Sequence, residues 1–396
     1  MTLKYAGLSC FARGRAYLPL LNRLVWLLAV VILAASSPQP AAALDFKLDV
    51  PLVIERAKLA AGHMAASETP TGSFVYEHDF AAGGAGDGDN MVRQAGAGFA
   101  LAQHLAHTAD LSHASRVRRA LEFYERQSLA FGMGQLVASD RDLASATPGA
   151  TALVLLTELF YFEATGDGRF AVLREAWLRG LEALWLPQGG FARAPGIEES
   201  SPYYDGEAWL ALAHYHRLVA ADPVAAALLE KADRYALSRY SQSPDLGFMH
   251  WGLMAAAIRH QTTGDHSFLA YSAELAEFQI DELSPHVFSD TNACYMVEGL
   301  AAAAGEIEGV PAYAGLLRRI AARIEAELSK SLHLQILPGQ TEIHLGPGRF
   351  LYDEALYEQA GAFLNGRHAL RSRIDFTQHC LSALMRYEAW QKRREG

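Results

Sequence analysis

Apolar residues recur at helical spacing through most of the chain, as at Leu210, Leu212, Ala213 and Leu218. Each apolar stretch ends in a turn that carries a glycine or another small residue, often followed by an aspartate. Glycine tolerates the left-handed conformation at a helix C-terminus, and an aspartate side chain accepts hydrogen bonds from the first free N–H groups of the next helix. The pattern therefore predicts a series of helical hairpins. The aspartates at these turns are Asp110, Asp167, Asp222 and Asp265.

Extension from each turn predicts six helix pairs, with a repeat of about 43–58 residues that is close to HEAT-repeat length. The first helix of each pair is richer in alanine, and the second carries more charge. This difference predicts an inner ring of closely packed helices and an outer ring that faces solvent. The predicted pairs are residues 90–128, 149–186, 205–241, 249–283, 292–330 and 352–392.

The connections between the pairs are long and contain short strand-like patches, at residues 73–80, 134–139, 189–194 and 333–353. Solenoids usually have short, uniform connections, whereas long decorated loops at one end favour a closed ring with a functional mouth. The pattern over residues 90–392 resembles the six-hairpin (α/α)6 toroid of many polysaccharide hydrolases and lyases. No signature of one such family is present, so the resemblance implies a fold and carbohydrate handling but no particular reaction.

The resemblance implies an all-α fold with small β-hairpin decorations, as a single domain over residues 44–396. In such a ring the N-terminal turns of the inner helices meet at one end. Five of the six predicted turns carry charged, amide or imidazole side chains, and four of these five also carry aromatic ones. Sugar rings stack on aromatic faces, and sugar hydroxyls bond to carboxylates, amides and guanidinium groups. The predicted substrate-binding residues are Asp89, Asn90, Arg93, Tyr203, Tyr204, His250, Trp251, Asp290, Asn292, Tyr352 and Asp353.

Helix capping is the alternative explanation for the acidic residues, because a helix N-terminus favours negative charge by about 0.3–1 kcal/mol. Capping does not explain the neighbouring aromatic residues. Glycoside hydrolysis requires two carboxyl groups across the scissile bond. The predicted catalytic residues are Asp205, Glu207 and Glu298, with Asp205 or Glu207 acting together with Glu298.

Two other functions are compatible with the same turns. A polysaccharide lyase or uronate epimerase needs a Tyr or His base and a group that neutralises a uronate, and Asn90, Arg93, His250 and Tyr203 or Tyr204 could supply them. The third hypothesis is a toroid without catalysis that binds a glycan or a partner protein within a surface-polysaccharide system.

The N-terminal segment has the pattern of an export signal. Basic residues and no acidic ones precede the apolar run Leu24–Ala35, and an A-x-A sequence lies at Ala41–Ala43. This pattern predicts a signal peptide over residues 1–43 with cleavage before Leu44. The alternative is an uncleaved anchor that attaches the protein to the inner membrane. We therefore expect a periplasmic or secreted protein.

The signal contains four of the 34 basic residues and none of the 44 acidic ones, so the mature chain carries 30 basic against 44 acidic residues, a net charge of −14. This charge argues against nucleic acid as a partner. The glycine-rich segment 83–88 lacks the lysine and serine of a phosphate loop, and HExxH spacing is missing. We expect no cofactor and no metal. Of the three cysteines, Cys10 belongs to the signal, and Cys294 and Cys380 form either a disulfide or two buried thiols.

Overall fold

The computed structural model describes residues 48–395, apart from 87, 220–221, 288–290 and 347. The predicted signal peptide and Asp290 lie outside the described residues. Leu48–Gly396 form one unit of the chain. Among the described helices, none combines the length and the apolar character that crossing a membrane requires.

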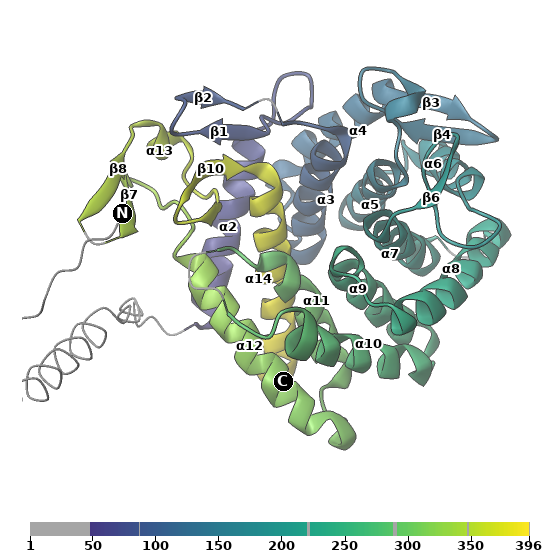
Figure 1. The fold of residues 1–396 in the computed structure, drawn as a ribbon. Helices are drawn as coiled ribbons and strands as arrows, with labels where there is room; N and C mark the ends of the chain where they lie inside the picture. Colours follow the sequence, from purple (N-terminus) through teal and green to yellow (C-terminus); the bar gives the residue numbers. More distant parts are fainter. Residues whose placement is uncertain (1–47, 87, 220–221, 288–290, 347, 396) are drawn as a thin grey trace, which may run out of the picture. The chain divides into compact units, whose positions relative to one another are not determined.

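The described residues contain an inner ring of six helices (Figure 1). Consecutive members pack side by side, and the last, α14, packs against the first, α3, so the ring is closed. Small residues allow this close packing. A Cβ atom on Gly299 would lie 2.8 Å from the Cα atom of His250 on the neighbouring helix. The inner helices are α3 (Met91–Thr108), α5 (Pro148–Thr165), α7 (Pro202–Leu218), α9 (Leu246–Thr263), α11 (Cys294–Ile307) and α14 (Ile374–Glu395).

Each inner helix packs against an outer helix, which confirms the predicted (α/α)6 toroid. The turns are built as predicted. Gly264 ends α9 in the left-handed conformation at φ 68°, and Asp265 caps the next helix through the backbone N–H of Ser267 at 2.8 Å. The outer helices are α2 (Val50–Ala66), α4 (Ala114–Gln127), α6 (Ala171–Ala183), α8 (Pro223–Gln242), α10 (His266–Phe278) and α12 (Ala314–Leu332).

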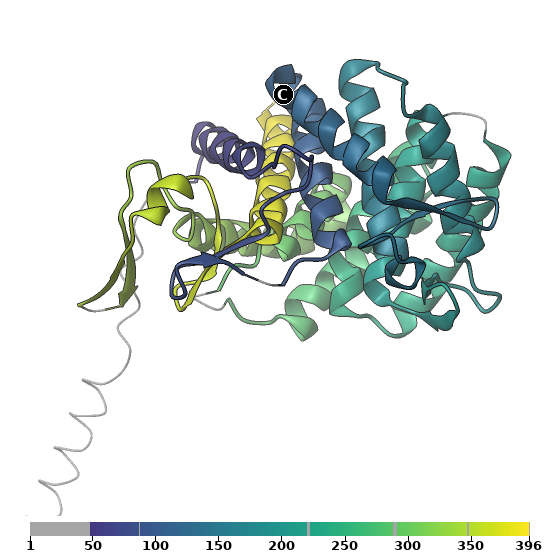
Figure 2. The ribbon, with the colours of Figure 1, turned by 90° about the horizontal axis from the view of Figure 1, so that it is seen from above.

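The sixth hairpin differs from the predicted pair 352–392. Only its inner member, α14, comes from that segment, and its outer partner is α2, from the other end of the described chain. Figure 2 shows α2 in purple beside α14 in yellow. The prediction is wrong because the segment before the predicted turn contains only the four-residue helix Ala355–Glu358, and residues 364–373 form two strands around a tight turn at Arg367 and His368. The helix α2 carries its own signals, an Asp49 cap and a proline in the first turn.

Small antiparallel sheets lie in the connections, as the strand-like patches predicted. Three are two-stranded hairpins, and a fourth sheet has the order β2-β1-β10-β9. The strands are β1 (Glu77–Asp79), β2 (Gly84–Ala85), β3 (Ser128–Phe131), β4 (Gly134–Val137), β5 (Ala192–Ala194), β6 (Ile197–Ser200), β7 (Glu342–Gly346), β8 (Arg349–Tyr352), β9 (Leu364–Gly366) and β10 (Ala369–Arg373). The remaining short helical turns are Leu111–His113, Leu143–Ser145, Gln279–Leu283, Pro311–Tyr313 and α13 (Ala355–Glu358).

A disulfide joins the first turn of α11 to the second turn of α14. It links Cys294 to Cys380, with 4.8 Å between their Cα atoms. The alternative of two free thiols is therefore excluded for this structure. The bond fixes two adjacent inner helices at the end of the ring where their N-termini lie.

Candidate functional site

A cavity of about 450 Å³ lies at the N-terminal ends of the inner helices, and all six inner helices contribute to it. We call it the mouth pocket. Its position agrees with the prediction that the N-terminal turns of distant hairpins meet at one end of the ring. Its lining residues are Val92, Arg93, Leu153, Tyr203, Glu207, Leu246, His250, Trp251, Asn292, Tyr295, Asn365, Asp375, Phe376, Gln378 and His379.

Glu207, on the second turn of α7, is a buried carboxyl group whose Oε2 atom has no hydrogen-bond partner among the described residues. Its side chain lines the mouth pocket, although the residue is only 3% exposed. Burial raises its pKa to about 8, because the charged form loses hydration and gains no compensating bond. Gly149 on α5 leaves room for this group, since a Cβ atom there would lie 2.1 Å from Oε2.

Three further polar side chains, from α9, α11 and α14, form a cluster at the mouth pocket. His250 and His379 line the cavity, whereas the predicted catalytic residue Glu298 is fully buried and does not line it. The Nδ1 atom of His379 lies 2.7 Å from Oε2 of Glu298, and the rings of His250 and His379 are 5.4 Å apart. Burial, together with the charge of His379, holds the pKa of His250 well below its usual value. Burial alone would lower the pKa of His379, but the Glu298 carboxylate outweighs it and the pKa is raised. The cluster therefore joins a neutral imidazole to an imidazole–carboxylate pair.

A basic group borders the mouth pocket on the side of α3 and α14. Arg373 donates to both carboxylate oxygens of Asp375, with its Nε 3.0 Å from Oδ1. The Nε atom of Arg93 lies 3.5 Å from Oδ2 of the same carboxylate. Both guanidinium groups also lie over the ring of Tyr76, that of Arg93 at 4.9 Å and that of Arg373 at 5.3 Å from the ring centroid. Asp375 is thus a carboxylate held by two cations, in contrast to the unpartnered Glu207.

Aromatic side chains complete the lining. Trp251 is buried, with its ring 4.6 Å from that of His250, whereas Tyr203 and Tyr295 are partly exposed at the opening. Asn292 has a structural role as well as a pocket-lining position. Its side chain accepts from the backbone N–H of Cys294 at 2.8 Å and donates to Cys380 Sγ at 3.1 Å.

The structure does not bring all the predicted residues to the mouth pocket. Asp205 is buried away from the lining, where it accepts from the Tyr240 hydroxyl at 2.6 Å and the Phe191 N–H at 2.8 Å. Burial raises the pKa of Asp205 to about 6. Its place in the hydrogen-bond network shows that it ties α7 to α8 and to the β5 strand region. Tyr204 turns toward Gly149, beside Glu207, without lining the cavity.

Residues at the other turns have local roles. Asn90 caps α3 through the N–H of Arg93, and Asp89 accepts from Gln94 Nε2 at 2.8 Å. Both are exposed and lie outside the lining. The prediction that Tyr352 and Asp353 begin an inner helix is wrong. Tyr352 ends strand β8 and is 70% exposed, and the Asp353 carboxylate accepts from the backbone N–H of Ala355, the first residue of α13, at 2.9 Å.

The sequence reasoning missed the residues that α14 contributes, above all Asp375 and His379. The predicted pair 352–392 makes this segment an outer helix, whose polar residues would face solvent. A usable signal was present, because Asp375 and His379 are spaced four apart and therefore share one face of an apolar helix.

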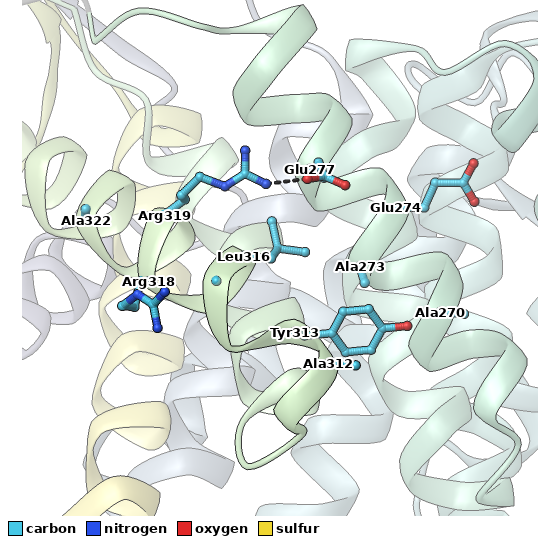
Figure 3. A pocket seen from close by; sticks show the side chains of 11 residues that line it. Ala270, Ala273, Glu274, Glu277, Ala312, Tyr313, Leu316, Arg318, Arg319 and Ala322 are labelled. Atoms are coloured by element: carbon cyan, nitrogen blue, oxygen red, sulfur yellow. Dashed lines mark hydrogen bonds and ion pairs between the residues drawn. The ribbon is translucent and has the colours of Figure 1, made fainter.

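A larger cavity, about 930 Å³, lies on the outer ring between α10 and α12 (Figure 3). Of its eleven lining residues four are alanines and four are charged, and one of the charged residues, Arg319, pairs with Glu277. Arg319 also pairs with Asp281 at 2.7 Å. Because Arg319 is already paired with two carboxylates, and because none of the buried polar residues that the structure describes lines this cavity, we assign the functional site to the mouth pocket.

No protein-family model matches the sequence, and no curated protein matches it. Solved structures do match. The alpha-1,6-mannanase GH76A of Salegentibacter sp. HEL1_6 matches with a TM-score of 0.63 at 12% identity, over 86% of this chain and 100% of its own. An inactive variant of that enzyme was solved in complex with alpha-1,6-mannotetrose.

Two solved structures with other activities match as well. An unsaturated glucuronyl hydrolase specific for heparin has a TM-score of 0.56 at 12% identity, over 87% of this chain and 99% of its own. A sugar epimerase from a ruminal bacterium has a TM-score of 0.57 at 10% identity, over 85% of this chain and 98% of its own. This chain therefore has the six-hairpin glycosidase-like toroid fold. Hydrolases and an epimerase share it, so the fold does not select the reaction.

Proposed function

We propose that this protein is a carbohydrate-active enzyme that hydrolyses a glycosidic bond in the mouth pocket, with Glu207 as the general acid. The observation that carries the proposal is the contrast between two carboxyl groups that line one cavity. The Oε2 atom of the buried Glu207 has no hydrogen-bond partner within the part of the chain that the structure describes, which favours the protonated form, whereas Asp375 is paired with Arg93 and Arg373. A pair of acids whose environments differ in this way supplies a proton donor and a charged base or nucleophile.

In this mechanism Glu207 donates its proton to the oxygen of the leaving group as the bond breaks. Asp375 acts on the opposite face of the sugar, either on the anomeric carbon or on a water molecule that attacks it. The carboxylate of Glu298 takes no part in proton donation here, because it already accepts from His379. The sequence predicted Asp205 or Glu207 together with Glu298. In this proposal Glu207 keeps a catalytic role, and Asp375 replaces Glu298 as its partner.

The dimensions and lining of the mouth pocket support a short oligosaccharide or the end of a polysaccharide chain as the substrate. A cavity of about 450 Å³ is within the range of small-ligand sites, about 300–1,000 Å³. Trp251, Tyr203 and Tyr295 offer aromatic faces, and Arg93 offers hydrogen-bond donors to hydroxyls. Enzymes of the same fold include a mannanase solved with a bound manno-oligosaccharide.

The test is incubation of the mature chain with a panel of oligosaccharides and aryl glycosides, with reducing ends and released phenol as readouts. We expect hydrolysis of at least one substrate and a loss of activity above about pH 8, where Glu207 ionises. Glu207→Gln should abolish hydrolysis of natural linkages but retain activity on aryl glycosides whose leaving group needs no proton. Glu182→Gln, on the exposed face of α6, is the matched control. Equal activity of Glu207→Gln on both substrate types would refute the assignment.

A second candidate is proton transfer at a sugar carbon, as in a lyase or uronate epimerase. It is favoured by the two imidazoles of the mouth pocket, 5.4 Å apart, with Arg93 nearby to neutralise a uronate. Absorbance of unsaturated uronates would detect the lyase, and solvent deuterium in the recovered sugar would detect the epimerase. Binding without turnover in all three assays would leave the third hypothesis, a glycan-binding toroid.

We also propose that the protein functions in the periplasm or outside the cell. The export pattern of residues 1–43 supports this location, and so does the Cys294–Cys380 disulfide, because such bonds persist in oxidising compartments. N-terminal sequencing of the protein from a cell fraction tests both parts. A start at Leu44 in the periplasmic fraction is expected, and an intact N-terminus in the membrane fraction would indicate the anchor.

A further inference from the structure

The imidazoles of His250 and His379 and the carboxylate of Glu298 come from three different inner helices and converge at the mouth pocket. Each side chain offers one ligand atom, and these atoms all lie within 4.8 Å of one another. We propose that these three residues bind a divalent transition-metal ion of the zinc class. The sequence predicted no metal, because none of the three is close to another in the chain.

The chemistry of the donors selects the type of ion. Two imidazole nitrogens and one carboxylate oxygen suit zinc, iron, cobalt or nickel, whereas calcium and magnesium prefer sites made of oxygen ligands. A set of two histidines and one glutamate also leaves coordination positions open, as in catalytic zinc sites. Because His250 and His379 line the mouth pocket, an open position would be available to water or to a sugar oxygen.

Unsatisfied polar atoms provide independent support. Both ring nitrogens of His250 and the Oε1 atom of Glu298 are buried and have no hydrogen-bond partner among the described residues. His250 is 3% exposed and Glu298 is fully buried. Buried polar atoms almost always have partners, so three orphans in one cluster need an explanation. A cation held between the three side chains would satisfy a nitrogen of His250 and the free carboxylate oxygen together.

The three ligand atoms are near one another, but their separations differ from those around a bound ion. Two ligands of a tetrahedral zinc ion lie about 3.3 Å apart when each bond is about 2.0–2.1 Å. The His379 Nδ1 and Glu298 Oε2 atoms, at 2.7 Å, share a hydrogen bond that the ion would replace. Binding therefore requires this pair to separate slightly and His250 to approach. The Cys294–Cys380 disulfide keeps the helices of the pair, α11 and α14, in place during such side-chain movement.

The test uses the untagged mature chain after treatment with a chelator. Zinc would be titrated in competition with a chromogenic chelator, and cobalt binding would be followed by its visible absorption. We expect one equivalent of bound metal. His250→Ala and His379→Ala should weaken binding by at least about 100-fold, given that even outer-shell changes cost 10–100-fold. Circular dichroism and a milder variant, His250→Gln, distinguish loss of ligation from loss of fold.

His214→Ala is the matched control. His214 is also a buried inner-helix histidine with an unpartnered ring nitrogen, Nε2, but it lies outside the cluster. We expect this variant to bind metal like the wild type. Absence of stoichiometric metal in the wild type, or binding unchanged in His250→Ala and His379→Ala, would overturn the proposal. The assay contains no sugar, so its outcome is separate from that of the hydrolysis test. Metal binding without hydrolysis would refute only the proposed reaction.

Discussion

The Nδ1 atom of His379 lies 2.7 Å from the Oε2 atom of Glu298, although the two residues are 81 positions apart in the chain. The contact exists because α14 closes the inner ring beside α11. Glu298 lies in the second turn of an apolar helix, where a lone carboxylate would be costly. The imidazole of His379 offsets that cost and places a charged pair at the base of the mouth pocket.

The pH dependence of stability should report on Glu207. Its pKa is about 8 in the folded protein against an ordinary value of 4.5, so between these pH values the folded state holds a proton that the unfolded state has lost. The contribution of this group to the free energy of unfolding is therefore fully present below about pH 4.5 and is lost as pH rises toward about 8. Glu207→Gln removes this pH dependence of stability, because the amide does not ionise.

Urea unfolding of the wild type and of Glu207→Gln across about pH 4–9 measures this effect. We expect similar stability near pH 4 and a variant that is more stable than the wild type near pH 9. Parallel profiles over the whole range would mean that Glu207 is not buried as a neutral acid.

Gly149→Ala should displace the carboxyl group of Glu207. The new methyl group would lie 2.1 Å from its Oε2 atom and 2.6 Å from Cδ1 of Tyr204, so these side chains must move. We expect a stability loss of about 1–3 kcal/mol from overpacking, and up to about 100-fold lower activity from the misplaced acid. Gly62→Ala is the control, because that helical glycine has open space around it and alanine should stabilise by about 0.5–1 kcal/mol. Equal behaviour of the two variants would contradict the steric argument.

The disulfide should contribute substantially to stability. It closes a loop between residues separated by 86 positions, for which the chain-entropy model gives about 4.6 kcal/mol. Reductant should therefore lower the urea midpoint of the wild type, and the double variant Cys294→Ser/Cys380→Ser should be equally unstable and insensitive to reductant. A double variant with the urea midpoint of the untreated wild type would show that the disulfide adds little to stability.

The packing of α2 against α14, which completes the sixth hairpin, gives a fourth prediction. Met64 is fully buried in α2, so Met64→Ala should cost about 2–5 kcal/mol. Ile54 lies on the same helix but is 43% exposed, and Ile54→Ala should change stability by no more than about 0.5 kcal/mol. Thermal or urea unfolding measures both. A negligible effect of Met64→Ala would show that α2 is a loosely attached segment and not part of the ring.

Much of the fold could be predicted because its signals are local. The turns that end each inner helix and the strand-like patches are written in short segments, and five hairpins were placed within a few residues of their observed ends. The sixth was wrong because its two helices come from opposite ends of the described chain. No local sequence pattern indicates that α2 packs against α14.

The candidate site was predicted less completely. Arg93, Tyr203, Glu207, His250, Trp251 and Asn292 do line one cavity, because they occupy equivalent turns of successive hairpins. Asp205 and Glu207 looked alike in the sequence, yet one faces a hydrogen-bond network and the other the mouth pocket. Two positions along a helix are about 200° apart, so only the packing of the neighbouring helices decides which one reaches the cavity.

The sequence by itself determined the helical hairpins, their inner and outer character and the end of the ring at which polar and aromatic residues gather, since these follow from spacing along a continuous chain. Only the tertiary structure decided which helix closes the ring, that Cys294 bonds to Cys380, and that His250, Glu298 and His379 form one cluster. Those contacts depend on the register of helices that pack against one another across the ring, and that register is fixed by side-chain volumes from all six hairpins at once.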